Sequence, residues 1–212
     1  MKLLVVGGGG REHAIIKKLK ENPRVETVYA LPGNGGIARD AVCVPEIGAR
    51  DIEKIVDFAK SHSIDFAVVA PDDPLALGCV DRLHEAGVPC FGPDAKAARI
   101  EASKVFSKNL MKKYGIPTAR YEVFDDPARA LAYLRSGVSF PIVVKADGLA
   151  LGKGVLIPQS LEEAEAAVRS IMEDKAFGDS GNQIVVEEFL TGPEVSVLAF
   201  TDGRSIAPMA SS

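Results

Sequence analysis

The sequence has few cysteines and no long apolar run. Its three cysteines, Cys43, Cys79 and Cys90, are odd in number and widely spaced. No CxxC pair and no Cys/His cluster with zinc-binding spacing occurs, so a zinc site is not indicated. We expect a reduced protein of the cytoplasm with buried thiols. The apolar run in MKLLVVGGGG is too short for a signal sequence or a membrane span, so no membrane partner is expected.

An excess of one charge is also lacking. The net charge is -4, and both halves of the chain carry nearly equal numbers of basic and acidic side chains. Neither half has a basic stripe, so nucleic acid is not expected as a partner, and any phosphate binding must be local. With 47% hydrophobic and 25% charged residues, the chain has the composition of a folded protein and not of a disordered one.

Residues 1–102 alternate between short apolar runs and amphipathic stretches, in the order β-α-β-β-α-β-α-β. This order predicts an α/β domain with a mostly parallel, Rossmann-like sheet covered by helices. The expected strands are residues 3–6, 25–31, 41–44, 66–70 and 90–91, and the expected helices are 11–21, 51–59 and 75–86.

Residues 103–212 form a second unit of α+β type. Helices are expected at 103–114, 127–134 and 161–172, and strands at 121–124, 142–146, 155–157 and 184–188. Residues 195–201 and 205–208 flank Asp202-Gly203, a sequence typical of a hairpin turn. Because the chain ends four residues after this hairpin, we expect it to stop inside a domain.

The first candidate site is the glycine run that follows the first strand, Gly7 to Gly10, with Arg11 behind it. A strand, glycines and a helix start suit phosphate, because the helix N-terminus offers unpaired N–H groups. A dinucleotide fingerprint is not met: its third glycine falls on Glu12, and Leu31-Pro32 stands where an acidic residue should follow. This disfavours an NAD oxidoreductase. A small phosphorylated ligand fits better, and a tight turn without ligand is the alternative.

Two more loops follow strands of the same predicted sheet, Pro32-Gly33-Asn34 and Pro71-Asp72-Asp73-Pro74. Ligands of open α/β sheets bind outside the carboxyl ends of the strands, where these loops lie. Taken alone, each is more typical of a turn than of a binding site.

The strongest candidate site begins at Lys145, which ends an apolar strand where an unpaired charge would be costly. A glycine-rich loop and another strand follow. The loop is not a P-loop, because Asp147 occupies the first glycine position and a strand follows it instead of a helix. We interpret it as a flap over phosphates, with an exposed hairpin as the alternative. Its members are Gly148, Gly152, Lys153 and Gly154.

The strand over 184–188 ends in two carboxylates, Glu187 and Glu188, and Glu194 follows. Such a strand end can line a nucleotide pocket, and a solvated strand end is the alternative. The histidines are scattered and suggest neither a metal site nor a Ser/His/Asp set; they are His13, His62 and His84.

Six segments resemble the phosphoribosylamine–glycine ligase (glycinamide ribonucleotide synthetase) family of ATP-grasp enzymes, in that family's order. They are VVGGGGREHA (5–14), PGNGG (32–36), FGPDAKAARIEASK (91–104), GIPTA (115–119), FPIVVKADGLALGKGV (140–155) and VVEEFLTGPEVSVLAFTDG (185–203). The resemblance spans essentially the whole chain and implies a pre-ATP-grasp sheet followed by an incomplete ATP-grasp domain.

The resemblance also implies a reaction. ATP would phosphorylate glycine to a glycyl phosphate, which the amine of 5-phosphoribosylamine attacks, giving glycinamide ribonucleotide, ADP and phosphate. The implied cofactors are ATP and Mg²⁺ or Mn²⁺, and the implied partners are these small molecules, with a monomeric enzyme.

Site residues are implied position by position. Lys104 and Lys145 resemble the nucleotide-phosphate lysines, and Gly148 to Gly154 resembles the phosphate flap. The segment Glu187, Glu188, Phe189 and Leu190 resembles the adenine contact, and Glu194 resembles the ribose carboxylate. The phosphoribosylamine side is expected at Gly8, Gly9, Gly10, Arg11, Glu12, Pro32, Gly33, Asn34 and Asp72.

Two departures from the family pattern matter. Asp72 stands where the family has a longer glutamate, so the side chain that carries this carboxylate is one methylene shorter. The family enzyme is also about twice as long, and its metal ligands are expected after Ser212. We therefore expect a fragment that lacks catalytic residues of its own and does not turn over alone. A stand-alone nucleotide- or phosphosugar-binding module without catalysis is the alternative.

Overall fold

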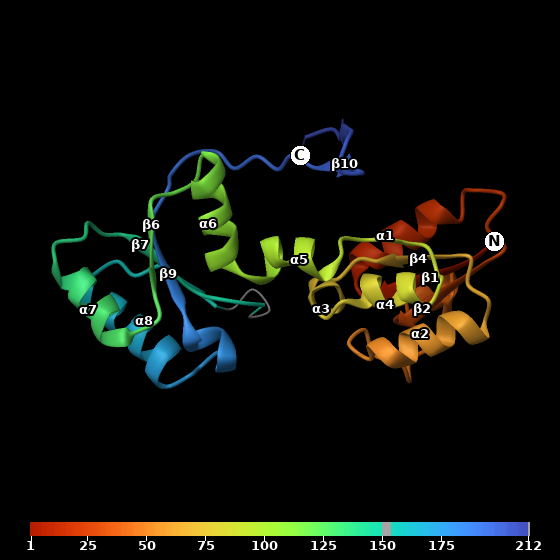
Figure 1. Cartoon of the computed structure of the whole chain (residues 1–212), viewed down its shortest axis with the longest axis horizontal. Helices are drawn as coiled ribbons and strands as arrows, with labels where there is room; N and C mark the ends of the chain where they lie inside the picture. Colours follow the sequence, from red (N-terminus) through yellow and green to blue (C-terminus); the bar gives the residue numbers. More distant parts are fainter. Residues whose placement is uncertain (150–153, 212) are drawn as a thin grey trace.

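The computed structural model describes residues 1–149 and 154–211. Figure 1 shows the red-to-yellow part of the chain gathered around one sheet and the green-to-blue part around another, with α5 (Ala95–Ala102) between them. The predicted α/β architecture, a parallel sheet followed by an antiparallel one, is confirmed.

The first sheet is parallel throughout and has the strand order β3-β2-β1-β4-β5. Its central strand β1 alternates between two cores: Leu4 packs on one face of the sheet, and Leu3 packs on the other with Ile16. Both faces are covered by helices, which explains why the strands are continuously apolar. The strands are β1 (Lys2–Gly7), β2 (Thr27–Pro32), β3 (Val42–Cys43), β4 (Phe66–Val69) and β5 (Cys90–Phe91).

The helices of this unit confirm the predicted alternation with one exception. The single helix predicted over 75–86 is wrong: the chain forms two helices separated at Gly78, whose φ of 79° is left-handed. Glycine adopts this φ readily, so the helical pattern on both sides does not merge. The elements are α1 (Gly10–Leu19), η1 (Ile37–Arg39), α2 (Ile52–Ser61), α3 (Asp72–Ala76) and α4 (Cys79–Glu85).

The second sheet is antiparallel, with the order β6-β9-β7-β8. Alternate residues of β7 (Ile142–Ala146) and β9 (Ile184–Glu188), such as Val144 and Val186, pack in the core with α7 (Pro127–Arg135) and α8 (Leu161–Val168). Lys145 and Glu187 lie one position further along, so they belong to the opposite face. Helix α6 (Lys104–Tyr114) runs beside this sheet (Figure 1), and its Lys108 pairs with Glu187. The strands are β6 (Tyr121–Phe124), β7 (Ile142–Ala146), β8 (Val155–Leu156) and β9 (Ile184–Glu188).

The helix predicted over 103–114 is confirmed as α6 (Lys104–Tyr114), which Ser103 caps and a left-handed Gly115 ends. The helix predicted over 161–172 forms α8 (Leu161–Val168) and then widens into a π-helical turn, η2 (Arg169–Glu173). The remaining helices are α7 (Pro127–Arg135) and η3 (Gly178–Asn182). Within the described part of the chain, no helix is both long and apolar enough to cross a membrane.

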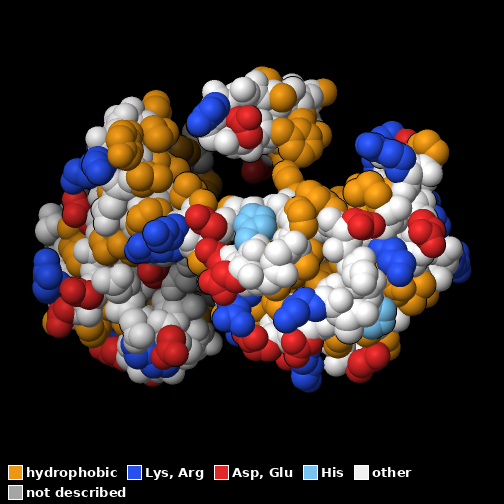
Figure 2. All heavy atoms as spheres, turned by 45° about the vertical axis from the view of Figure 1, so that its right-hand side comes forward, with side chains coloured by type: hydrophobic (Ala, Val, Ile, Leu, Met, Phe, Trp, Pro, Cys, Tyr) orange, Lys and Arg blue, Asp and Glu red, His pale blue; other side chains and the backbone are white. Residues whose placement is uncertain are grey.

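The predicted hairpin is present as β10 (Ala199–Thr201) and β11 (Ile206–Pro208), so its first strand is shorter than expected. The Asp202 side chain stabilises the turn by accepting hydrogen bonds from the backbone N–H groups of Arg204 and Ser205. Figure 2 shows the hairpin as a separate lobe with apolar side chains on its surface, and Phe200 meets Phe91 edge-on.

Candidate functional site

The glycine run after β1 is held by the helix that it starts. Gly7 has a φ of 127°, and a Cβ there would lie 2.6 Å from the Cγ of Glu12. The carboxylate of Glu12 is buried and accepts a 2.6 Å hydrogen bond from the N–H of Gly9. Glu12, expected at the phosphoribosylamine site, therefore shapes the loop from within, while Gly9, Gly10 and Arg11 stay exposed.

Two of the predicted loops are tied to each other. Asn34 donates a 2.6 Å hydrogen bond from Nδ2 to the carbonyl of Gly8, and the N–H of Gly33 bonds the carbonyl of Gly7. The Oδ1 of Asn34 accepts from the N–H groups of residues 36 and 37, which shapes its own loop after Pro32. A Cβ on Gly8 would lie 2.6 Å from the Gly33 carbonyl oxygen, and Gly33 itself has a φ of 72° and would bring a Cβ against Cys43 Sγ, so both positions need glycine. The structure thus brings Gly8, Gly33 and Asn34 together.

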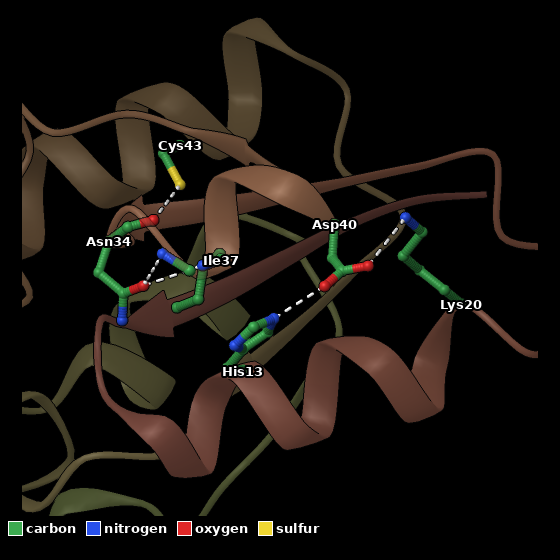
Figure 3. A network of polar contacts seen from close by, with 7 residues as sticks. His13, Lys20, Asn34, Ile37, Asp40 and Cys43 are labelled. Atoms are coloured by element: carbon green, nitrogen blue, oxygen red, sulfur yellow. Dashed lines mark hydrogen bonds and ion pairs between the residues drawn. The ribbon is translucent and has the colours of Figure 1, made fainter.

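A polar network behind this loop pair joins α1 to the segment after η1 (Figure 3). The ring of His13 lies with Nε2 2.8 Å from Asp40 Oδ2, and Lys20 Nζ lies 3.7 Å from the other oxygen. The hydrogen bond with His13 is the main cause that lowers the pKa of Asp40, and Lys20 acts in the same direction. This network fixes the Asn34 loop relative to the glycine run.

A cleft of about 450 Å³ lies where the two units meet, and it contains predicted residues from both. Arg11 and Asp72 come from the parallel-sheet unit, and Lys104 and Gly148 come from the second unit. The phosphoribosylamine and ATP candidates thus face one space. The other lining residues are Pro71, Asp73, Glu101, Leu149, Gly154 and Val155.

Lys104 and the start of the glycine-rich loop are bonded to each other. The Nζ of Lys104 donates a 2.9 Å hydrogen bond to the Gly148 carbonyl, and Asp147 accepts from Ser103 Oγ and from the N–H of Val105, both at 3.1 Å. Burial lowers the pKa of Lys104, Asp147 raises it, and nearby Lys145 lowers it further, with burial the largest effect. Lys104 is therefore a cation that gains from the approach of an anion.

A second cavity, of about 280 Å³, adjoins the first and holds three more charged groups. Lys104 lines both cavities, and Lys145 and Glu187 line this one. The Nζ of Lys145 lies 3.1 Å from each oxygen of Glu187. The structure thus unites the two predicted phosphate lysines with the first carboxylate of the predicted adenine segment.

Sequence analysis missed Lys108, which also lines this cavity and is buried. Its Nζ lies 3.0 Å from Glu187 Oε2 and donates a 2.7 Å hydrogen bond to Thr118. A lysine in an amphipathic helix normally points to solvent, so the sequence holds no local signal for this ion pair.

The remaining candidates are placed differently. Glu188 bonds the backbone N–H and the side chain of Arg120, contacts that lower its pKa, and so joins β9 to the start of β6. Phe189, Leu190 and Glu194 follow β9 and are exposed. Gly152 and Lys153, predicted for the flap, lie outside the described residues.

Thiol and metal chemistry receive no support from the described residues. All three cysteines are free, and burial raises the pKa of Cys79 to about 12 and that of Cys90 to about 11. Both thiols therefore stay protonated at neutral pH and are poor nucleophiles. Among residues 1–149 and 154–211, no group of three or more His, Cys, Asp or Glu side chains could hold a metal ion.

The second unit is of the ATP-grasp class, because a family model of an ATP-grasp domain matches residues 102–212. The biotin carboxylase domain of 2-oxoglutarate carboxylase from Hydrogenobacter thermophilus, solved with MgADP and bicarbonate, matches with a TM-score of 0.71 and 20% identity. The match covers 89% of this chain and 44% of that one. At this identity the likeness establishes the shared fold alone.

Family models narrow the class. The N domain of phosphoribosylglycinamide synthetase matches residues 1–101, and its ATP-grasp (A) domain matches residues 102–212. The chain therefore belongs to the phosphoribosylglycinamide synthetase family.

Individual relatives agree with this assignment. The phosphoribosylamine–glycine ligase of Allochromatium vinosum is 51% identical over all of this chain and 50% of its own length. The crystal structure of phosphoribosylamine–glycine ligase from Thermotoga maritima matches with a TM-score of 0.81 and 32% identity, over all of this chain and 49% of that one. The chain thus spans about half the length of the relatives that it matches.

Proposed function

We propose that this chain provides the nucleotide-phosphate site and the phosphosugar site for the ATP-dependent ligation of glycine to 5-phosphoribosylamine. The products would be glycinamide ribonucleotide, ADP and phosphate. The proposal rests on the family, on the name that its relatives share, and on a cleft in which both candidate sites meet. We also propose a monomer in the cytoplasm.

On the nucleotide side, Lys104 and Lys145 would bind the phosphates of ATP. Both reach the same cavity, and Lys104 is partly desolvated, which strengthens its attraction for an anion. The segment from Glu187 to Leu190 would contact adenine, and Glu194 would bind the ribose. Gly148 and Gly154 border the cleft and leave room for the phosphates to approach the backbone.

On the phosphosugar side, the exposed N-terminus of α1 offers free N–H groups to a phosphate. Gly10 and Arg11, at the start of α1, present them, since the N–H of Gly9 is bonded to Glu12, and Arg11 adds a guanidinium at the edge of the cleft. Asp72 lies across the same cleft and would bind a hydroxyl or the amine of phosphoribosylamine. Pro32, Gly33 and Asn34 would shape this side from the adjoining loop.

The reaction needs two steps, with glycine first phosphorylated on its carboxylate and then attacked by the amine. The lysines would neutralise the phosphoryl oxygens, and Arg11 and Asp72 would orient the amine toward the glycyl phosphate. Magnesium or manganese would accompany ATP, as magnesium accompanies ADP in the Hydrogenobacter domain. Among the described residues no cluster of His, Cys, Asp or Glu side chains could hold that ion.

One observation supports the proposal above others: Arg11 of α1 and Lys104 of α6, which belong to different units, line one cleft. Calorimetry can test it with ATP and with ribose 5-phosphate. Each ligand should bind the 212-residue chain, Lys104→Met should lose ATP and keep ribose 5-phosphate, and Arg11→Met should show the reverse. Loss of both ligands in each variant, without unfolding, would contradict two separate sites.

Turnover separates the ligase from the alternative of a binding module. A protein of the relatives' length that contains this chain should release ADP only when glycine and phosphoribosylamine are both present. Ligand binding without any dependence of ADP release on these substrates would favour the module. This chain alone should bind without turnover.

A further inference from the structure

Glu187 is a buried carboxylate that two lysines share. Its Oε2 lies 3.0 Å from Lys108 Nζ, and Lys145 Nζ lies 3.1 Å from both oxygens. Lys145 donates its hydrogen bond to Oε2, so Oε1 is buried without a hydrogen-bond donor among the described residues. Oε1 therefore relies on the ammonium of Lys145, 3.1 Å away, for its charge compensation, and any movement of Lys145 toward a ligand removes that contact.

The two lysines differ in depth and in their other contacts. The side chain of Lys108 is 10% exposed, close to the 5% of Glu187, whereas that of Lys145 is 27% exposed. Lys108 is also held by Thr118 Oγ1 at 2.7 Å and lies 5.5 Å from the ring centre of Tyr121. Lys108 is therefore fixed on three sides, and Lys145 is the one that can turn into the cavity.

We propose that Lys108 is a positioning residue that keeps Glu187 paired, and thereby frees Lys145 to bind a phosphate. The inference rests on the proposed ATP site, because it concerns how that site makes its cation available. When a phosphate arrives, Lys145 leaves the carboxylate, and Lys108 remains as its counter-charge.

The physical reason is the cost of an unpaired buried charge. Without Lys108, Lys145 would be the sole partner of Glu187, and moving it to a ligand would leave the carboxylate uncompensated. Lys145 would then stay on Glu187 and be lost to the phosphate. With Lys108 present, the cluster holds two positive charges for one negative charge, and the surplus is available to an anion.

Inorganic tripolyphosphate can test this, because it probes the phosphate subsite without adenine, and adenosine serves as the complementary probe. Lys108→Met should weaken tripolyphosphate binding by about tenfold, as expected for one charge-assisted contact, and leave adenosine binding unchanged. The double variant Lys108→Met/Glu187→Gln should recover tripolyphosphate binding, since Lys145 is then no longer held. Lys108→Arg keeps the charge and should bind as the wild type does. Lys112→Met, an exposed lysine of the same helix, is the matched control for one lost charge.

The outcomes separate the inference from the proposed function. If the wild-type chain binds neither tripolyphosphate nor ATP, the proposed nucleotide site is wrong, and the role of Lys108 with it. If the wild type binds and Lys108→Met matches Lys112→Met, the site stands and the positioning role is overturned. If Lys108→Met loses tripolyphosphate and adenosine together, and the double variant does not recover tripolyphosphate, Lys108 only maintains the fold. Urea unfolding of each variant checks that it is folded under the binding conditions.

Discussion

Replacing Gly8 by alanine tests whether the two glycine loops share one backbone contact. The new Cβ would lie 2.6 Å from the carbonyl oxygen of Gly33 and 3.3 Å from its carbonyl carbon. Backbone atoms cannot rotate away as a side chain can, so the loops must separate. Two hydrogen bonds oppose that separation: Asn34 Nδ2 to the Gly8 carbonyl, and Gly33 N–H to the Gly7 carbonyl.

The size of the effect follows from these contacts. Overpacking at a close contact costs about 1–3 kcal/mol, and weakening two hydrogen bonds adds about 0.5–1.5 kcal/mol for each. Since Asn34 is exposed, we take the lower part of the hydrogen-bond range and expect Gly8→Ala to reduce the free energy of unfolding by about 2–4 kcal/mol. Ribose 5-phosphate affinity should fall as well, because the loop that presents the N–H groups is displaced.

Gly10→Ala is the matched control, two positions away in the same run. A Cβ at Gly10 meets nothing within 4 Å, and Gly10 is the first residue of α1. Because alanine favours a helix, this change should leave the free energy of unfolding unaltered or raise it by up to about 1 kcal/mol. Urea titrations followed by circular dichroism measure both variants. Equal stabilities of Gly8→Ala and Gly10→Ala would refute the argument from the Gly33 contact.

Three further predictions concern charge and polarity. Burial lowers the pKa of Lys104 below its usual 10.5, and a bound triphosphate would raise this pKa again. At a pH just below 10.5, Lys104 should therefore take up a proton when ATP binds. Calorimetry in buffers of different ionisation enthalpy measures the uptake, and an equal uptake in Lys104→Met would contradict the assignment. The hydrogen bond with His13 lowers the pKa of Asp40, so its stabilisation is complete above about pH 4 and is lost as the pH falls through the lowered pKa. The stability difference between wild type and Asp40→Asn should therefore narrow in acid, and a constant difference would count against the pair. Asn34→Ala loses three hydrogen bonds, two of them exposed, and should cost about 1–2 kcal/mol in urea unfolding, against about half of that for Asn22→Ala, which loses one.

The parallel sheet was predictable because its signals are local. Each strand is a short apolar run that ends in glycine or proline, and each helix shows its own apolar period. The error over 75–86 has a local cause as well. The apolar residues on both sides of Gly78 keep helical spacing. A prediction from this spacing alone cannot detect that Gly78 adopts a left-handed conformation and separates two helices. A glycine in the middle of a predicted helix was the one available signal.

The sequence predicts the glycine loops as a candidate site, but it does not show which of their residues shape the loops and which stay exposed. Glu12 departs from the dinucleotide fingerprint, and its role as an acceptor for the Gly9 N–H depends on how the helix begins. That Asn34 bonds Gly8 depends on β1 and β2 being neighbours in register, with Gly7 opposite Pro32. The sequence predicts both strands and both loops; the pairing that brings the loops together is a property of the folded sheet.

The lysine cluster shows the same limit more sharply. Alternation along β7 and β9 places Lys145 and Glu187 on the faces opposite to their core residues, which a period of two could have predicted. The antiparallel pairing of β7 with β9 places Val143 opposite Glu187, and this brings Lys145 and Glu187 within ion-pair distance of each other. No local sequence pattern predicts this pairing. The role of Lys108 is even harder to predict from the sequence, because its partners lie on the loop before β6 and on β9. Its burial results from the packing of α6 against the face of the sheet that carries Glu187. Charges that compensate one another across distant elements leave no periodic trace in the sequence. This is why a glycine-rich loop beside Lys145 predicted a phosphate site, while the lysine that we propose makes Lys145 available became visible only in the fold.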